Sequence, residues 1–523
     1  MRWRVLSWVV GVTVALVMAT AAAASAKVLL VGSFHGIHGK YSSLQAAVNA
    51  AKPGDWILVG PGDYKTSSSR EPAGRTDTPA AVLITKPGLH IRGMNRNTVI
   101  IDGTTGGAAC NAKTRFQNFG PKSKLGRLGL NGIMVWKADN VSVQNLTACN
   151  FLGGAGDVGN GIWWNGGDGS GKIGGWGYLG SYLTATSTYF HDEKTAATYG
   201  IFSSNWDGGT WDQTYASNFN DSGYYIGACQ QICNQTLNHG WAENNALGYS
   251  GSNSGGWLLI ENSQFDNNQD GFDTNSQNGD NPPPQDGACP AGVKPPIKGA
   301  PSCWVFYKNN VHDNNNPNVP AAGSASAGPV GTGMSISGGH WDTVMDNTFK
   351  NNNAWGIVLV PYSDSGTSCP GGTPNFLGSG TCFWDDYGNA VLGNSFAHNG
   401  SFGHPTNGDI AWVNLQADPA PCFSGNTEPG GKPATTSPLL AQTVFGSCSG
   451  QTTPPNGNAA FLSQVLCDAQ FNGPGTASCP PGVGPYPRAT HIRMRRLPKH
   501  LKTMPNPCAG VPKTPWCRAG KPI

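Results

Sequence analysis

Acidic residues gather in one short segment of the chain, 267–281, which reads NNQDGFDTNSQNGDN. The segment holds Asp270, Asp273 and Asp280. Carboxylates that converge on one face of a protein can act as general acid and base, or they can bind Ca²⁺. We therefore predict Asp270 and Asp273 as catalytic residues, and Asp270, Asp273 and Asp280 as ligands of a Ca²⁺ ion.

The segment GGHWD supplies a second set of candidates, His340 and Asp342. Histidine titrates near neutral pH, so His340 is the preferred general base, although a histidine in a turn can equally be structural. Asp270 and Asp273 are three residues apart, and we expect Asp270 at a turn and not beside Asp273. The sequence therefore offers no convincing pair of carboxylates for glycoside hydrolysis.

These residues must be positioned by an internal repeat that fills the central chain. Each repeat reads as a strand that starts with Gly, a turn, a second strand and an Asn-rich turn. The starting glycines are Gly132, Gly161, Gly200, Gly223, Gly248, Gly271, Gly333 and Gly356, and four of the gaps between them are 23–25 residues. A period this short, with strands and without helices, indicates one coil of a parallel β-solenoid, in which stacked coils bury a hydrophobic face that one coil cannot.

Alternation along the strands predicts which side chains face the core. Two inward columns are expected, one after the starting glycines and one before the Asn-rich turns. The first is Ile133, Ile162, Ile201, Phe272, Met334 and Ile357, and the second is Phe151, Phe190, Phe219, Phe265, Phe349 and Phe396. Asn tolerates left-handed turns and can hydrogen-bond the next coil, so we place Asn150, Asn220, Asn268 and Asn352 at the corners.

The outward positions of the same strands form a candidate binding surface. They are Met134, Trp136, Trp163, Phe202, Tyr225, Ser250, Asp273, Asn275, Ser335 and Val358. Aromatic rings pack against the apolar faces of sugars, so the predicted glycan-binding residues are Trp136, Trp163, Phe202, Tyr225 and Asn275. The alternative is that loops cover these aromatic residues as a secondary core. The insertions 166–182, 278–302 and 364–384 leave from one corner, where they would wall a cleft.

The start of the chain and its cysteines both point to export. Residues 1–26 combine Arg2 and Arg4, an apolar stretch and an A-x-A end, which predicts a cleaved secretory signal and a secreted protein without a membrane anchor. The cysteines fall into near neighbours, and pairing them in sequence order gives Cys110–Cys149, Cys229–Cys233, Cys289–Cys303, Cys369–Cys382, Cys422–Cys448, Cys467–Cys479 and Cys508–Cys517. A zinc site is the weaker alternative, because the sequence has no C-x2-C pair.

Composition and charge limit what the chain can be. With 12% charged residues, 74 Gly, 38 Pro and 17 Trp among 523 residues, long solvated helices and disorder are both disfavoured. The net charge of +3 conceals a tail of +9 after Asp468 and a body of −8. The basic segment 491–502 could bind an anionic wall polymer or nucleic acid. We favour its docking on the acidic body as a C-terminal cap, and we expect no nucleic-acid partner.

Residues 41–65 and the coils together carry a family resemblance. YSSLQAAVNAAKPGDWILVGPGDYK reads as a short helix, capped by Ser42 or Ser43, that covers the first coil and is followed by a strand. This segment, followed by G-I-x-V and N-x-F coils, resembles the secreted right-handed parallel β-helix proteins of the pectin-lyase-like superfamily over about residues 28–415. The resemblance implies the fold and a substrate groove along a walled face. The superfamily includes polysaccharide lyases, glycoside hydrolases, uronan epimerases and esterases, and DGFDTN is loosely similar to the Asp motifs of the epimerases and polygalacturonases.

The sequence thus predicts an all-β chain with a signal peptide at 1–26, a right-handed parallel β-helix with a short N-terminal capping helix at 27–417, and a disulfide-rich, irregular, basic tail at 418–523. The predicted function is that of an exported monomer which binds, and as an enzyme cleaves, a polysaccharide or cell-wall glycan by a lyase or hydrolase reaction. The alternatives are a non-catalytic glycan- or cell-wall-binding adhesion protein and a purely structural solenoid. Ca²⁺ is the one cofactor that the carboxylates suggest.

Overall fold

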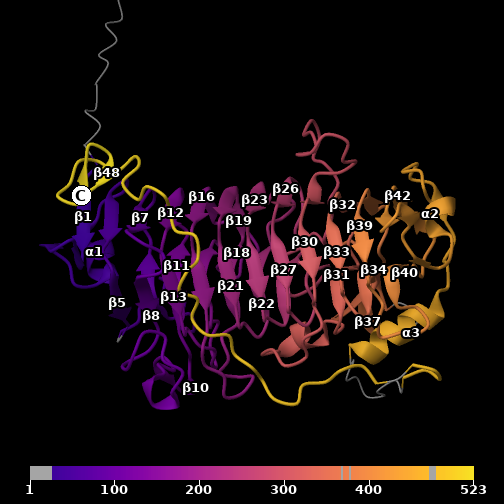
Figure 1. Ribbon diagram of the computed structural model, residues 1–523, viewed down its shortest axis with the longest axis horizontal. Coiled ribbons are helices and arrows are strands. Elements are labelled where there is room, and N and C mark those ends of the chain that lie inside the picture. Colours follow the sequence, from indigo (N-terminus) through magenta and orange to yellow (C-terminus); the bar gives the residue numbers. More distant parts are fainter. Residues whose placement is uncertain (1–25, 67, 367–368, 376–377, 470–478, 484) are drawn as a thin grey trace, which may run out of the picture.

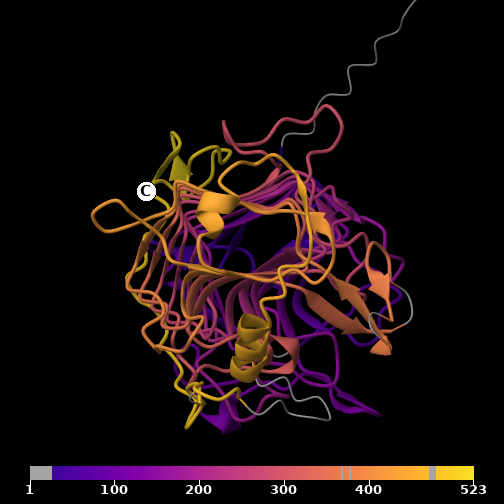
Figure 2. The ribbon, with the colours of Figure 1, turned by 90° about the vertical axis from the view of Figure 1, so that its right-hand side faces the viewer.

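The chain winds into a right-handed parallel β-helix with three long sheets, as the repeat predicted (Figure 1). The computed structural model describes residues 26–523 except 67, 367–368, 376–377, 470–478 and 484, so all but the last residue of the predicted signal peptide lies outside the described residues. Each coil gives one strand to sheet 2, then one to sheet 1 and one to sheet 3, before the next coil stacks on it. Figure 2 looks along the axis of this coil.

The three sheets are defined by their strands, given from the N-terminal to the C-terminal coil. Sheet 1 contains β1 (Val28–Val31), β4 (Trp56–Val59), β7 (His90–Gly93), β12 (Val141–Gln144), β16 (Tyr178–Ser181), β20 (Gly209–Asp212), β23 (Gln235–Asn238), β26 (Leu258–Glu261), β29 (Trp304–Tyr307), β32 (Thr343–Met345), β38 (Ala390–Leu392) and β42 (Cys422–Ser424). Sheet 2 contains β6 (Ala80–Ile84), β11 (Asn131–Trp136), β14 (Ile162–Asn165), β18 (Tyr199–Ser204), β22 (Ser222–Gly227), β25 (Leu247–Ser252), β28 (Asp273–Asn275), β31 (Thr332–Ser337), β34 (Trp355–Val360), β40 (Gly408–Trp412) and β45 (Thr436–Ser437). Sheet 3 contains β5 (Gly62–Lys65), β8 (Val99–Asp102), β13 (Thr147–Cys149), β17 (Thr184–Thr186), β21 (Tyr215–Ser217), β24 (Trp241–Glu243), β27 (Gln264–Asp266), β30 (Asn310–His312), β33 (Thr348–Lys350), β39 (Ser395–Ala397), β43 (Thr427–Glu428) and the antiparallel β44 (Lys432–Pro433).

Smaller elements lie outside these sheets. They are the pairs β2 (Ser33–Phe34) with β3 (Ile37–His38), β9 (Lys122–Ser123) with β10 (Gly126–Arg127), β15 (Gly175–Trp176) with β19 (Trp206–Asp207), β41 (Asp418–Pro419) with β46 (Thr452–Thr453) and β47 (Cys517–Arg518) with β48 (Lys521–Pro522), and the three-stranded sheet of β35 (Tyr362–Ser365), β37 (Thr381–Trp384) and β36 (Thr373–Pro374). The α-helices are α1 (Leu44–Ala50), α2 (Ala441–Val444) and α3 (Ala459–Asp468). No helix within the described part of the chain is long and apolar enough to cross a membrane.

The starting glycines stack on one another along sheet 2. A Cβ atom on Gly132 would lie 2.2 Å from the carbonyl oxygen of Gly161, and one on Gly248 would lie 2.3 Å from that of Gly271. The same close approach repeats in every coil from Gly161 to Gly356. Glycine is required at these positions because the neighbouring coil comes too close for a side chain.

Asparagine side chains form two ladders that join successive coils at the corners. The ladder between sheets 3 and 2 consists of Asn245, Asn268, Asn314, Asn352 and Asn399, and each Nδ2 donates to the next Oδ1 at 3.0–3.2 Å. The ladder between sheets 1 and 3 consists of Asn309, Asn347, Asn394 and Asn426, with distances of 2.9–3.1 Å. The residue before each ladder residue has a positive φ, which turns the chain into the corner.

Most of the predicted core positions are confirmed. Both inward columns lie in one buried core, apart from Phe190. Phe190 is half-buried because it lies in the connection between β17 and β18, which leaves the coil. Asn268 and Asn352 belong to a ladder, whereas Asn150 and Asn220 do not, since their amides donate to Thr188 and to the backbone of Glu193.

Both ends of the solenoid are covered. The predicted capping helix is confirmed as α1, whose Ala46 amide donates to the Ser43 hydroxyl at 3.3 Å and whose Leu44 and Val48 are buried against the first coil. At the other end, β42, β43 and β45 continue the three sheets beyond residue 417. The sequence placed the boundary too early, at 417, because the last coils lack the starting glycine by which the repeat was recognised. Helices α2 and α3 follow, and they had no counterpart in the irregular tail that we expected.

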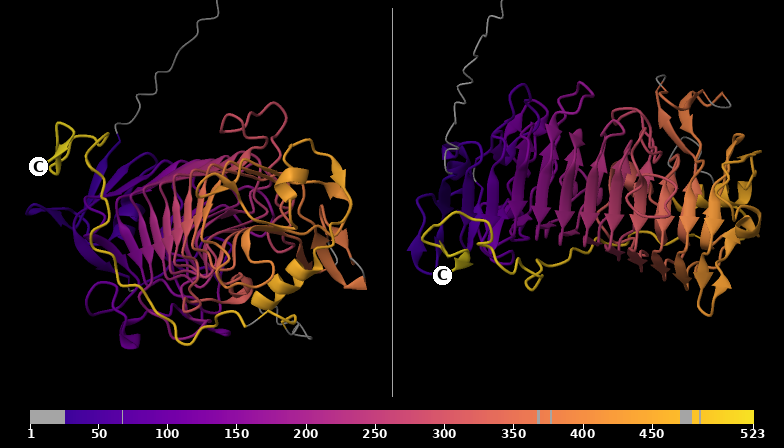
Figure 3. Two further views of the ribbon diagram at one scale, coloured as in Figure 1. Left: turned by 45° about the vertical axis from the view of Figure 1, so that its right-hand side comes forward. Right: turned by 90° about the horizontal axis from the view of Figure 1, so that it is seen from above.

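The basic tail runs back along the outside of the coils to the first coil, as the yellow trace in Figures 1 and 3 shows. The backbone carbonyls of the tail accept hydrogen bonds from asparagine side chains at successive corners of the coils. Asn244 donates to Arg493 and Asn218 to Arg495. Asn97 donates to Leu501. The tail ends against the N-terminal coil, where Trp516 is fully buried and its Nε1 donates to the Ile37 carbonyl at 3.0 Å. The tail therefore docks on the body as favoured, but it covers the N-terminal end and not the C-terminal one.

All fourteen cysteines form the disulfides that sequence order predicted. The last of them, Cys508–Cys517, closes the loop that carries Trp516 into its pocket. The zinc alternative is thereby excluded, because no thiol is left to bind a metal.

We predict that Gly248→Ala destabilises the fold by about 1–3 kcal/mol, because the new methyl group would overlap the backbone of the next coil. Gly279→Ala is the matched control, since the nearest atom to its Cβ would be 3.9 Å away. Urea unfolding followed by circular dichroism measures both. Equal stability of the two variants would contradict the stacking of the glycines.

We predict that Trp516→Ala releases the docked tail, because it removes a buried indole and one hydrogen bond. Trypsin should then cleave the basic segment 491–502 more than about tenfold faster, as the open state becomes more populated. Trp176→Ala serves as control, because that side chain is 49% exposed. Unchanged cleavage in Trp516→Ala would show that the tail is held by other contacts.

Candidate functional site

A cavity of about 770 Å³ lies over the outer face of sheet 2. Its floor is made by side chains of the adjacent strands β18, β22, β25, β28, β31 and β34. The register along the floor is the expected one, with Tyr225, Ser250, Asp273, Ser335 and Val358 side by side on successive coils. The volume lies within the usual range of ligand-binding cavities.

Two walls enclose this floor. At the C-terminal ends of the strands stand Gln277, Asp280 and Tyr362, from the insertions that follow β28 and β34. These insertions contact each other, since the Asn278 amide donates to Asp364 Oδ2 at 2.8 Å. The opposite wall combines residues 317–330, helix α3 and the tail segment 487–492. The predicted wall of insertions is confirmed only in part: 278–302 lines the cavity through Asp280 and 364–384 contacts that insertion through Asp364, whereas no residue of 166–182 is among the described lining residues. The C-terminal part of the chain supplies the second wall.

The aromatic strip is present but covered. Trp136, Trp163, Phe202 and Tyr225 are 3–8% exposed, and they pack together in a satellite core with Met134. The rings of Trp163 and Phe202 stack at 4.7 Å, and Phe202 meets Tyr225 edge-on at 4.8 Å. Of these four, only Tyr225 lines the cavity. The prediction of a glycan-binding strip is thus corrected to the secondary core, because all four rings are buried in that core.

Asp273 lies on the floor of the cavity as a carboxylate held by three donors. Its Oδ1 accepts from the hydroxyls of Ser335 at 2.6 Å and Ser337 at 3.0 Å, and its Oδ2 accepts from Asn275 Nδ2 at 2.9 Å. Asn275, predicted to bind substrate, therefore positions Asp273 while it also lines the cavity. Burial raises the pKa of Asp273 above its ordinary value.

Asp270 lies beside Asp273, contrary to the expectation from their spacing. The Ser335 hydroxyl reaches both, at 3.1 Å from Asp270 Oδ2 and 2.6 Å from Asp273 Oδ1. The strand β31 of the next coil brings this serine into register with Asp273, which the sequence spacing alone does not reveal. Asp270 is fully buried and does not line the cavity, and burial followed by the charge of Asp273 raises its pKa well above the ordinary value. Asp270 is therefore a positioning residue.

Two further carboxylates face the cavity, each paired with a tyrosine. Tyr225 donates to Asp280 Oδ2 at 2.6 Å, and Tyr199 donates to Asp221 Oδ2 at 3.0 Å. Burial raises the pKa of Asp280, and it raises the pKa of Asp221 to about 7. Asp221 was missed in the sequence. The repeat position of Asp270 is occupied by Ser222, because Ser222 pairs with Leu247 and Leu247 with Asp270, so the repeat by itself does not point to Asp221.

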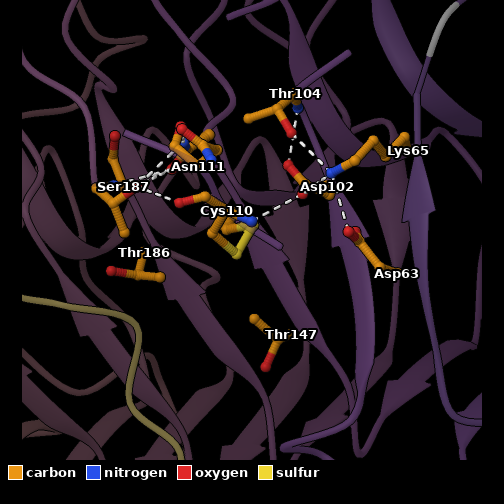
Figure 4. Close-up of a disulfide and its surroundings, with 12 residues drawn as sticks. Asp63, Lys65, Asp102, Thr104, Cys110, Asn111, Thr147, Thr186 and Ser187 are labelled. Atoms are coloured by element: carbon orange, nitrogen blue, oxygen red, sulfur yellow. Dashed lines mark hydrogen bonds and ion pairs between the residues drawn. A yellow bond between two sulfur atoms is a disulfide. The ribbon is translucent and has the colours of Figure 1, made fainter. Parts of the chain in front are cut away.

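The structure does not bring the predicted Ca²⁺ ligands together. Among the described residues, only Asp102, Cys110 and Cys149 place three possible ligand atoms within 4.8 Å of one another. Both cysteines are joined in a disulfide, and Asp102 accepts from Lys65 Nζ and from the Cys110 amide at 2.8 Å each (Figure 4). That group is structural, and Asp270, Asp273 and Asp280 do not form the cage that a single Ca²⁺ needs.

His340 and Asp342 lie away from the cavity, in the corner between β31 and β32. His340 is 3% exposed, its Nε2 is 3.0 Å from the Asp385 carbonyl, and its ring stacks on Tyr387 at 3.8 Å. Burial lowers the pKa of His340 to about 4, so its ring is neutral at physiological pH. Asp342 is fully buried and accepts from Gln285. Neither residue lines the cavity, and the geometry does not support the expected general base.

An adjacent acidic pair near this corner also escaped notice in the sequence. Asp385 accepts from the Leu415 and Gln416 amides at 2.7 and 2.6 Å, whereas both carboxyl oxygens of the buried Asp386 have no hydrogen-bond partner among the described residues. Burial raises the pKa of both groups, that of Asp385 to about 7. The pair does not line the cavity, so it takes no part in the candidate site.

We predict that the protein gains stability as the pH falls from 8 to 5. A carboxyl group whose folded pKa is raised binds more protons in the folded than in the unfolded state, so the free energy of unfolding falls as the pH rises through that window, from about 3.8 to about 7 for Asp221. Asp221→Asn should raise the free energy of unfolding at pH 8 by on the order of 1–2 kcal/mol and have little effect at pH 5. Calorimetry at the two pH values measures this.

The exposed turn residue Asp346 supplies the control, because Asp346→Asn keeps a residue type that tolerates its φ of 54°. This variant should leave the pH dependence unchanged. A pH dependence equal in Asp221→Asn and the wild type would refute the assignment of a raised pKa to Asp221.

Comparisons with known proteins bear on the fold. No family model and no curated protein sequence matches the chain. Similar solved structures include the A-module of the Azotobacter vinelandii mannuronan C-5 epimerase AlgE6 (14% identity, 75% of this chain and 90% of that chain covered, TM-score 0.45), the Erwinia chrysanthemi pectin methylesterase PemA (11%, 82% and 98%, TM-score 0.32) and the tailspike of E. coli bacteriophage HK620 in complex with a pentasaccharide (13%, 74% and 62%, TM-score 0.39). At such low identity and TM-score these likenesses say nothing of activity. The three long parallel sheets themselves show the parallel β-helix fold.

Proposed function

We propose that this protein is an exported enzyme that binds a polysaccharide in the cavity over sheet 2 and hydrolyses it between two carboxyl groups. The observation that carries the proposal is the meeting of Asp221, Asp273 and Asp280 with three tyrosines, Tyr199, Tyr225 and Tyr362, in one walled cavity. Aromatic rings beside carboxyl groups suit a sugar, which offers both apolar faces and hydroxyl groups.

Asp221 is the proposed general acid. Its pKa of about 7, set chiefly by burial, keeps a large fraction of the group protonated near neutral pH, as a proton donor to a leaving oxygen requires. Tyr199, whose pKa burial raises well above the ordinary value, stays protonated and holds the carboxyl group in place.

Asp273 is the proposed general base. Ser335, Ser337 and Asn275 all donate to it, and such donors stabilise the anion. Ser250 of β25 lies between the two groups: its hydroxyl is 3.4 Å from Asp221 Oδ1, and it is the register partner of Asp273 on the adjacent strand. Two carboxyl groups with one residue between them suit the separation of about 6.5–9.5 Å at which such a pair admits a water molecule and inverts the anomeric centre.

Lyase and epimerase reactions fit the cavity less well. Both act on uronates and need a cation to neutralise the substrate carboxylate. The only basic side chain among the described lining residues is Arg488, which lies 3.7 Å from Asp468 in an ion pair. A polyuronate would meet several carboxylates and this one paired guanidinium.

Export is supported by the disulfides. All fourteen cysteines are paired, which is typical of proteins of oxidising compartments. The basic start of the chain, its apolar stretch and its A-x-A end give the corresponding signal, and cleavage after Ala26 would leave α1 and the first coil intact. We propose a division into a β-helix that begins at residue 27 and extends through β45, followed by the tail.

We predict that the purified protein releases reducing ends from a polysaccharide without forming an unsaturated product that absorbs in the ultraviolet. Asp273→Asn and Asp221→Asn should each lower turnover by about 10²–10⁴-fold, as expected for loss of a general acid or base. Asp346→Asn is the control with unchanged activity. NMR of the first product should show inversion at the anomeric carbon.

The pH profile gives a second readout. Turnover should fall as the pH rises past about 7, because Asp221 then loses its proton, and this limb should vanish from the residual activity of Asp221→Asn. Glycan binding without any turnover across neutral, acidic and amino polysaccharides would instead favour the non-catalytic, glycan-binding protein.

A further inference from the structure

We infer that the cavity over sheet 2 selects a glycan whose sugars carry free, protonated amino groups. The inference rests on the proposed function in that it concerns the same cavity, and it names the substrate class. It follows from the number, orientation and spread of the acidic groups in the cavity.

The lining is acidic and almost without counter-charge. Five carboxyl groups line the cavity, those of Glu193, Asp221, Asp273, Asp280 and Asp468. Arg488 is the only basic side chain among the described lining residues, and its guanidinium also donates to the Asp468 and Cys467 carbonyls at 2.8 and 2.9 Å. Its charge is therefore directed at the end of α3 and not at the carboxylates on the sheet.

The carboxyl groups are arranged as hydrogen-bond acceptors. Asp273 accepts an amide proton from Asn275, and Asp280 and Asp221 accept from the hydroxyls of Tyr225 and Tyr199. Donors of this kind stabilise the ionised form against burial. A neutral sugar could share these acceptors through its hydroxyl groups, but it would leave the charge of Asp273 and Asp280, and that of the ionised fraction of Asp221, uncompensated.

One acceptor in the cavity has no partner. Asp468, at the end of α3, is 1% exposed, and its Oδ1 accepts the Val330 amide at 3.1 Å. Its Oδ2 is buried and has no hydrogen-bond partner among the described residues. A buried oxygen of this kind costs free energy unless a ligand supplies a donor, and an ammonium group supplies three.

The spread of the charges favours a chain of amines over a metal ion. No three carboxylates of the cavity come within 4.8 Å of one another in the described structure, so none forms a point site for a divalent cation. The carboxylates instead come from separate places: Asp221 precedes β22, Asp273 begins β28 two strands along the sheet, and Asp280 belongs to the insertion after β28. Asp468 lies at the end of α3, in the opposite wall. Ammonium groups repeated along a polymer match a row of separate charges, whereas a polyuronate would be repelled.

The test is calorimetric binding of three oligosaccharides of equal length to the wild-type protein: a glucosamine oligomer, its fully N-acetylated counterpart and a galacturonate oligomer. Mass spectrometry checks that each remains uncleaved during the titration. The glucosamine oligomer should bind at least about tenfold more tightly than the N-acetylated one at low salt, and the advantage should shrink as salt is added. The galacturonate oligomer should bind most weakly.

Two variants locate the preference. Glu193→Gln and Asp280→Asn each remove one cavity charge while keeping an oxygen that can accept a hydrogen bond, so each should weaken glucosamine binding about 3–10-fold and reduce its salt dependence. Binding of the N-acetylated oligomer should change less than twofold. Asp346→Asn removes an exposed charge outside the cavity and should change neither affinity.

Equal affinity for the amine and acetylated oligomers, or a preference that neither variant alters, would overturn the inference. Failure of the proposed function looks different: the amine preference would be present, but no oligomer would be cleaved. Cleavage of the acetylated oligomer without any amine preference would leave the hydrolase standing and remove only the selectivity.

Discussion

The close stacking of one coil on the next is the constraint on which the rest of the structure depends. Along the central strands of sheet 2, from Gly132 to Gly333, each starting glycine faces the carbonyl of the next at a distance that no Cβ can occupy. The two asparagine ladders fix the same spacing at the corners of the coils that they join. Because these contacts repeat from coil to coil, side chains on successive strands are held in register, and a column of outward residues becomes a continuous surface.

That register explains why the site is built as it is. It places Ser335 beside Asp273 and thereby brings Asp270, from the preceding turn, into the same hydrogen-bonded group. The same register aligns the outward-facing residues of sheet 2 in one column. The aromatic part of this column is buried, and the cavity lies over the polar part. Burial under these walls raises the pKa of Asp221 and Asp273, so the walls that enclose the site also set the protonation of its carboxyl groups.

The tail links the two ends of the solenoid. It leaves α3, forms part of the cavity wall at 487–492, and continues along the corner asparagines to the first coil, where Trp516 is buried. A repeat fold has weak contacts between distant coils, so a strap that touches many of them couples their stability. One continuous segment of the tail thus forms part of the cavity wall, at 487–492, and covers the first coil with Trp516.

The sequence alone determined the architecture, because a solenoid is specified locally. Glycine spacing, strand alternation and the amphipathic segment at 41–65 predicted the coils, the outward column, the cap α1 and, by order, the disulfide pairs. Asp273 was correctly placed on the outer face by the same alternation. Phe190 was wrongly predicted as a core residue, because an insertion removes it from the repeat. The end of the β-helix was wrongly placed at 417, because the last coils lack the starting glycine.

Tertiary structure decided the site, because its members come from different coils and from the far end of the chain. No spacing reveals that Asp270 and Asp273 share a serine 62 residues after Asp273, that Asp221 faces the same cavity, or that α3 closes it. His340 seemed suited to catalysis by residue type, yet burial keeps its ring neutral, and its place in the corner between β31 and β32 keeps it out of the cavity lining. Likewise the aromatic residues had the right register for a glycan, and only the tertiary packing decided that all four are buried in a core, with Tyr225 alone also lining the cavity. Local repeats fix where a side chain points, whereas exposure depends on what the rest of the chain lays over it.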